Sequence, residues 1–163
     1  MYDVIIIGAG PAGISAALYT KRANLKVLVL YNSISNVEKA NKIDNYYGFP
    51  NGITGNELFQ NGIQQAKNLG ANVEKLDVTA IEYNENYFEV KTASKNFESK
   101  TVIISTGNKK ITPNIPGIKE FDGKGISYCA ICDAFFYRNK AIGIIGNRRF
   151  CSFRSKNFRK CYR

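Results

Sequence analysis

Residues 2–22 are YDVIIIGAGPAGISAALYTKR: a β-branched apolar run, a glycine-rich turn and an alanine-containing segment. The run at 2–7 is typical of a strand that is buried on both faces of a parallel sheet. The segment 14–22 has the composition of a helix, and KVLVL at 26–30 predicts a second parallel strand. These residues together predict a βαβ unit and therefore an α/β, Rossmann-like fold.

The turn between the first strand and the helix has the GxGxxG pattern of dinucleotide-binding folds, with Gly8, Gly10 and Gly13. We expect Gly8 to permit the tight turn, Gly10 to let a pyrophosphate approach the backbone, and Gly13 to let the helix pack on the strand. The helix N-terminus would add free amides and partial positive charge. The alternative is a glycine-rich turn that binds no ligand.

The second strand lacks the acidic residue that usually follows it and binds the ribose hydroxyls. Tyr31, Asn32 and Ser33 stand at this place. A hydrogen bond from Asn32 or Ser33 to a ribose is the expected substitute.

Downstream, an irregular polar stretch at 32–44 precedes a capping box at Thr54 and Glu57, which predicts a helix that runs to Leu69. A two-residue alternation over 72–105 predicts a β-meander and then a buried strand, with strands at 72–78, 80–83, 87–92, 95–98 and 101–105. Prolines and glycines near 110–118 suggest a domain boundary, and KAIGIIG at 140–146 predicts the first strand of a second βαβ unit. We therefore divide the chain into 1–112, 113–147 and 148–163.

Cys129 and Cys132 form a CxxC motif followed by Asp133. A CxxC pair can close a disulfide and exchange it with another protein. The alternatives are zinc binding and two inert buried thiols; zinc is disfavoured because the chain has no histidine. Asp133 either caps the following helix or transfers a proton to a thiol. We expect no metal site.

Composition excludes several protein classes. No apolar run approaches the roughly 18 residues of a membrane span, and no basic segment precedes the first strand, so we expect neither a secretory signal nor a membrane partner. We expect a cytoplasmic protein. Of the 163 residues, 44% are hydrophobic, which suffices for a packed core.

The net charge of +10 is concentrated at the C-terminal end. Residues 148–163 hold seven Lys and Arg and no acidic residue, and without them the net charge is +3. A basic arm for nucleic acid or membrane and a disordered, solvated terminus are two interpretations. We favour a third interpretation, in which residues 148–163 are not the segment into which the preceding fold was built to continue.

Four features together resemble bacterial thioredoxin reductases of the low-molecular-weight type. They are the GAGPAG turn, the loop at 45–50, the STG sequence at 105–107, and YCAICDAFFYRNK at 128–140. The resemblance implies an FAD domain followed by the start of a nucleotide-binding domain that carries the CxxC motif. It also implies electron transfer from NADPH through FAD to the Cys129–Cys132 disulfide and on to thioredoxin.

Carried onto this chain, the resemblance implies roles for individual residues. Cys129 would attack thioredoxin, Cys132 would lie next to the flavin, and Asp133 would act as acid and base. The residues expected at the FAD are Gly8, Gly10, Pro11, Ala12, Gly13, Asn45, Val78, Thr106 and Gly107. A homodimer is expected for the full-length form.

Two departures from the family pattern leave alternatives open. Residues 146–150, GNRRF, lack the second glycine turn of NADPH-using members, so a ferredoxin-linked, NADPH-independent reductase is one alternative. The family's later nucleotide-domain strands and returning FAD segment are absent, so we expect an N-terminal portion that holds FAD weakly. A non-catalytic nucleotide-binding fragment is the other alternative.

Overall fold

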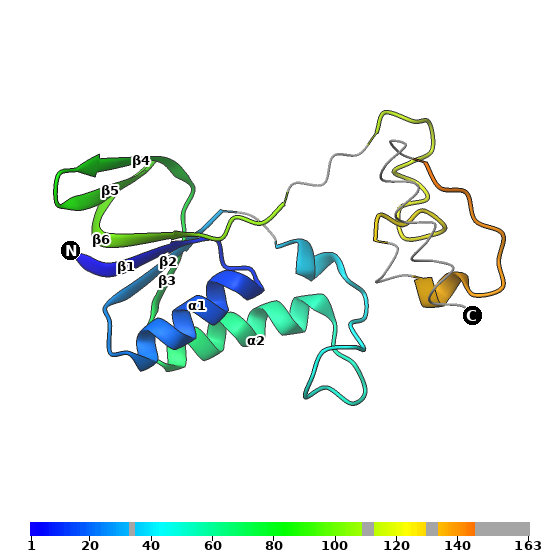
Figure 1. Cartoon of the computed structure of the whole chain (residues 1–163), viewed down its shortest axis with the longest axis horizontal. Helices are drawn as coiled ribbons and strands as arrows, with labels where there is room; N and C mark the ends of the chain where they lie inside the picture. Colours follow the sequence, from blue (N-terminus) through cyan, green and yellow to red (C-terminus); the bar gives the residue numbers. More distant parts are fainter. Residues whose placement is uncertain (33–34, 109–112, 130–133, 146–163) are drawn as a thin grey trace. The chain divides into compact units, whose positions relative to one another are not determined.

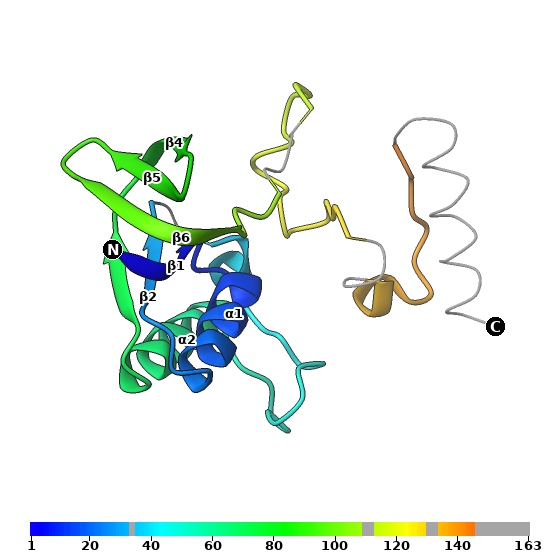
Figure 2. The ribbon, with the colours of Figure 1, turned by 60° about the vertical axis from the view of Figure 1, so that its left-hand side comes forward.

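The computed structural model describes residues 1–32, 35–108, 113–129 and 134–145, and divides the chain into two compact units, Met1–Lys109 and Lys110–Arg163. Unit 1 is built on a six-stranded sheet with the order β3-β2-β1-β6-β5-β4. Its helices α1 and α2 lie side by side on one face of this sheet (Figures 1 and 2). The predicted α/β fold, with a parallel sheet, helices and a meander, is confirmed. In the described part of the chain, no helix combines the length and the apolar character that a bilayer span requires.

Strands β1 (Tyr2–Ile7) and β2 (Val27–Tyr31) are neighbouring inner strands of the sheet, and their side chains alternate between two apolar clusters. Val4 and Ile6 pack with the helices, whereas Ile5 and Ile7 pack on the other face with Val90 of β5. Because both faces are covered, an unbroken apolar run is favourable here, at roughly 1.5–3 kcal/mol for each large side chain buried.

Two helices connect the parallel strands. Helix α1 (Pro11–Arg22) begins three residues before the predicted start, because Pro11 occupies the first helical position, where its missing N–H costs nothing. Helix α2 (Gly55–Asn68) begins at the predicted capping box: Thr54 Oγ1 accepts from Glu57 N at 3.2 Å, and Glu57 Oε2 accepts from Thr54 N at 3.1 Å. Phe59 and Ile63 are among its buried residues.

The polar stretch after β2 was predicted to be irregular. It instead contains the short 3-10 helix η1 (Asn36–Lys39). Ser35 and Glu38 form a second capping box at its start. Gly55 at the start of α2 donates to the carbonyl of Ala40 at 2.8 Å, so α2 and this segment meet closely.

The predicted strand boundaries over 72–105 were wrong at two places. Strand β3 (Asn72–Lys75) does not belong to the meander but pairs in parallel with β2. The two predicted strands at 95–98 and 101–105 are one continuous strand, β6 (Asn96–Ile104). The meander therefore consists of β4 (Val78–Asn84), β5 (Tyr87–Thr92) and the first half of β6.

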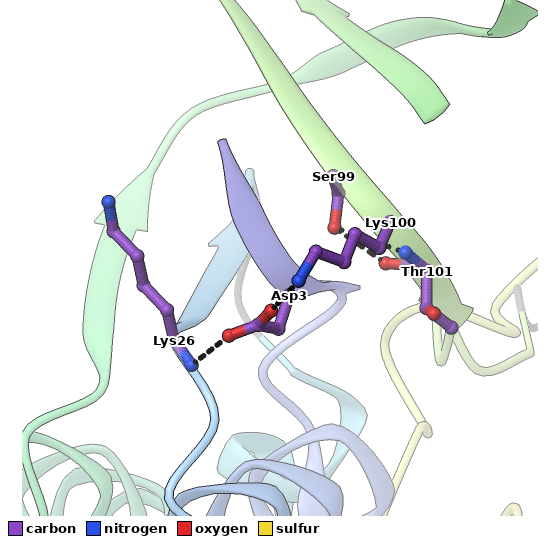
Figure 3. A network of polar contacts seen from close by, with 5 residues as sticks. All are labelled: Asp3, Lys26, Ser99, Lys100 and Thr101. Carbon is purple, nitrogen blue, oxygen red and sulfur yellow. Dashed lines mark hydrogen bonds and ion pairs between the residues drawn. The ribbon is translucent and has the colours of Figure 1, made fainter. Parts of the chain in front are cut away.

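Strand β6 changes partner at Ser99, which pairs with Phe88 of β5 on one side and with Tyr2 of β1 on the other. Near this point Asp3 of β1 links the residue before β2 to the middle of β6 (Figure 3). Its carboxylate accepts from the Lys26 backbone N–H at 2.9 Å and pairs with Lys100 Nζ at 2.7 Å. The Lys100 hydrogen bond, followed by the Lys26 backbone bond, lowers the pKa of Asp3.

The described residues of unit 2 contain little regular structure: an isolated bridge between Asp122 and Ile126, and the 3-10 helix η2 (Ala134–Tyr137). The prediction of a strand at 140–146 was wrong for its described residues, 140–145. A strand needs a hydrogen-bonded neighbour, and no described strand follows Ile104.

Candidate nucleotide-binding turn and redox cysteine

The glycine turn fits against the end of β6 so closely that two of its glycines cannot carry a side chain. Gly8 has φ +108°, and a Cβ there would overlap the carbonyl group of Ser105. A Cβ on Gly13 would overlap the Gly8 carbonyl oxygen and lie 2.6 Å from Ser105 Oγ. These two glycines let β1, α1 and β6 meet at one point.

Gly10 differs from them, because it is open on one side. It is the N-cap of α1 with φ −68° and ψ 178°, a conformation that any residue can adopt. Among the described residues, a Cβ there would meet only Ser35 Oγ, at an ordinary contact distance of 3.5 Å. The turn therefore has room for an incoming group in front of Gly10.

The N-terminus of α1 has no capping side chain and no acidic residue in its first turn. Pro11 has no N–H, which leaves the backbone amides of Ala12 and Gly13 at the exposed end of the helix dipole. Such an end binds phosphate or carboxylate groups. A pyrophosphate fits this cradle, which combines uncapped amides with the open face of Gly10.

Ser105 holds the two sides of the turn together, a role that the sequence did not assign to it. Its backbone N–H donates to the Ile7 carbonyl at 2.8 Å, and its Oγ lies 2.9 Å and 3.0 Å from the carbonyl oxygens of Ile7 and Gly8. The available signal was a hydroxyl residue directly after a buried strand. Thr106 and Gly107 follow it and are exposed, with Gly107 at φ +69°.

Two further residues expected at the cofactor lie elsewhere in unit 1. Asn45 lies in the loop 44–50, which lines an open hollow of about 610 Å³. Tyr47 in this loop is 99% exposed. Val78, the first residue of β4, is half-buried against the second apolar cluster.

The end of β2 carries a polar pair that spans 45 positions of the sequence. Asn32 Nδ2 donates to Asp77 Oδ1 at 2.7 Å. Asp77 immediately precedes Val78, and both members of the pair are exposed. Sequence reasoning considered Asn32 here but missed Asp77.

The CxxC motif belongs to unit 2. Cys129 is disulfide-bonded, and the other three cysteines, Cys132, Cys151 and Cys161, lie outside the described residues, as does Asp133. The Cys129 backbone N–H donates to Ser127 Oγ at 3.2 Å.

Next to Cys129, Tyr128 is half-buried, and desolvation, followed by the Asp122 carboxylate, raises its pKa. Both effects favour the neutral phenol. Among the described residues there is no cluster of three metal-binding side chains.

The chain matches known proteins over most of its length. The model of the pyridine nucleotide-disulphide oxidoreductase family matches residues 2–147. A thioredoxin reductase of Bacillus subtilis is 41% identical over 148 residues, which are 90% of this chain and 46% of the relative. A thioredoxin reductase of Ureaplasma parvum is 40% identical over 149 residues, 90% of this chain and 48% of the relative.

Solved structures of thioredoxin reductases are also similar to this chain. Thioredoxin reductase from Streptococcus pyogenes has a TM-score of 0.90 and 33% identity, with 98% of this chain and 53% of that chain covered. The atypical thioredoxin reductase TRi from Desulfovibrio vulgaris has a TM-score of 0.64 and 35% identity, with 99% and 55% covered. The chain spans about half the length of the curated relatives it matches.

Proposed function

Because this chain belongs to the pyridine nucleotide-disulphide oxidoreductase family, we propose that it is the N-terminal portion of an FAD-dependent thioredoxin reductase. In this proposal unit 1 binds the adenosine and pyrophosphate of FAD, and Cys129 and Cys132 carry the exchangeable disulfide. Thioredoxin reductases of this family use FAD and NADPH. The bound flavin would supply the electron pair that opens the disulfide.

The observation that carries the proposal is the uncapped start of α1 beside the open face of Gly10. The other helical starts of unit 1 are capped by their own side chains, whereas this one presents Ala12 and Gly13 amides to an anion. Gly8 and Gly13 keep the turn tight. Thr106 and Gly107 would lie beside the cofactor, Asn45 near the flavin and Val78 near the adenine.

The thiol chemistry would proceed by disulfide exchange. Once the disulfide is reduced, the Cys129 thiolate attacks one sulfur of the thioredoxin disulfide and expels the other as a thiolate. Cys132 then attacks the Cys129 sulfur, which releases reduced thioredoxin and restores the Cys129–Cys132 disulfide. Asp133 would donate and accept the protons of the two thiol groups. Two electrons leave the dithiol and two enter the substrate.

Counting thiols after reduction of the flavin tests this relay. The chain is reconstituted with FAD, the flavin is photoreduced without oxygen with EDTA as the electron donor, and free thiols are titrated. We expect two more thiols per chain than in the oxidised sample, and the same gain when Cys151 and Cys161 are replaced by Ser. The gain is lost in the Cys129→Ser variant. A fully reduced flavin with no new thiol in the unsubstituted chain contradicts the proposal.

A second electron donor is favoured by one sequence observation. Residues 146–150, GNRRF, contain one glycine and lack the rest of the second GxGxxA turn, which supports a ferredoxin-linked reductase that does not use NADPH. Mixing the FAD-loaded chain with NADPH separates the two possibilities. Rapid bleaching of the flavin absorbance supports NADPH as donor and excludes the ferredoxin-only form.

A further inference from the structure

We propose that Asp77, held in place by Asn32, binds the ribose hydroxyls of the adenosine nucleotide in unit 1. This inference rests on the proposed FAD site. Asp77 would supply the carboxylate that the end of β2 lacks, from a different strand. Asn32 would act as a positioning residue.

The sheet topology brings the two residues to one edge. Strand β3 pairs in parallel with β2, with Tyr31 opposite Lys75. The carboxyl ends of the two strands therefore meet, and Asn32 is the first residue after β2 while Asp77 is the second after β3. In open α/β sheets, ligands bind outside these carboxyl ends, and the ribose lies at the end of the second strand.

The chemistry of the pair leaves acceptors for a ligand. An ionised carboxylate only accepts hydrogen bonds, so the Asn32 amide must present its N–H to Asp77 Oδ1, as the structure shows. Among the described residues, neither side chain makes another hydrogen bond. Asp77 Oδ2 and Asn32 Oδ1 are thus two acceptors for the two hydroxyl donors of a ribose.

A carboxylate at this position also sets specificity. It accepts from a free 2′-hydroxyl but repels a 2′-phosphate, because both groups are negatively charged. We infer that unit 1 takes adenosine nucleotides with a free 2′-hydroxyl, such as FAD or ADP, and rejects 2′-phosphorylated ones. A site for NADPH would then have to lie elsewhere.

The test measures ligand binding by the 163-residue chain with ADP, 2′-deoxy-ADP and adenosine 2′,5′-bisphosphate, using calorimetry or ligand-observed NMR. Because a hydrogen bond to a charged group is involved, we expect ADP to bind about tenfold more tightly than 2′-deoxy-ADP. Asp77→Asn should weaken ADP binding about tenfold and bring the ratio of the two affinities close to one. It should also improve binding of the bisphosphate relative to ADP.

Two further variants sharpen the test. Asn32→Asp places two carboxylates together and should weaken ADP binding, whereas the exchange Asn32→Asp with Asp77→Asn restores an amide–carboxylate pair and should recover most of the affinity. Glu98→Gln removes the same charge from an exposed position on β6 and should leave the ADP to 2′-deoxy-ADP ratio unchanged. Thermal unfolding followed by circular dichroism checks that each variant is folded.

The outcomes separate this inference from the proposed function. If Asp77→Asn keeps the ratio of the unsubstituted chain while Gly10→Ala still weakens ADP binding, the ribose assignment is wrong and the nucleotide site stands. If the unsubstituted chain binds no ADP even at millimolar concentration, the proposed FAD site and this inference both fail.

Discussion

The alanine substitution Gly10→Ala should separate nucleotide binding from stability. Of the residues that the structure describes, the new methyl group would meet only Ser35 Oγ, at 3.5 Å, and φ −68° is an ordinary value for alanine. Gly→Ala at a compatible position stabilises by about 0.4–1 kcal/mol, while alanine is a poorer N-cap than glycine. We therefore expect the free energy of unfolding to change by less than about 1 kcal/mol.

Binding should respond far more strongly, because in the proposed site a phosphate approaches the backbone at Gly10, where the methyl group would be added. A displaced phosphate loses hydrogen bonds of the charged kind, which contribute about 1.5–3 kcal/mol each. Loss of one such bond raises the Kd for ADP roughly tenfold to hundredfold. Titration of ADP, or of FAD by flavin fluorescence, measures this change.

The matched variant Gly13→Ala should show the opposite behaviour. Its Cβ would overlap the Gly8 carbonyl and crowd Ser105 Oγ, and overpacking of this kind costs on the order of 3 kcal/mol. For a domain of about 100 residues this lowers Tm by roughly 12–24 °C. Gly143→Ala, where no described atom lies within 4 Å of the added Cβ, serves as control and should change neither quantity. Unchanged ADP affinity in a folded Gly10→Ala variant would refute the cradle.

Two further predictions concern stability. The pKa of Asp3 is lowered by Lys100 and by the Lys26 N–H. The stability that the Asp3 carboxylate adds is therefore present above its unfolded pKa and is lost as pH falls through its folded pKa. The difference in urea midpoint between the unsubstituted chain and Asp3→Asn should shrink from pH 7 to pH 3. Thr54→Ala removes the cap of α2 and its bonds to Glu57, and should destabilise the chain by about 1 kcal/mol, measured by denaturant unfolding; an unchanged midpoint would show that the cap contributes nothing.

The sequence predicted the elements whose signal is local. Strands β1 and β2 are apolar runs because both of their faces are buried, and α2 is marked by the capping box at Thr54. The start of α1 was placed too late because a glycine-proline turn has no apolar period, although Pro11 is a favourable first helical residue.

The features that were missed depend on contacts between distant residues. Strand β3 has four residues, NVEK, with no buried face, so nothing in it indicates that its partner is β2. Ser105 bonds to carbonyls 97 and 98 positions away, and Asp77 to an amide 45 positions away. Local patterns therefore located the glycine turn, but not the contact of Ser105 with it or the contact of Asp77 with Asn32.

The starts of the helical segments in unit 1 show how an anion site arises in this fold. Ser35 with Glu38 and Thr54 with Glu57 satisfy the first amides of η1 and α2. The two glutamate carboxylates also interact favourably with the partial positive charge at these helix starts. The start of α1 has neither device. A capping side chain at residue 10 would occupy the space that a phosphate needs. The missing cap and the lack of a side chain at Gly10 therefore serve the same proposed anion site. In the proposed site, a bound anion would supply the hydrogen bonds and the negative charge that the other two starts obtain from their own sequence.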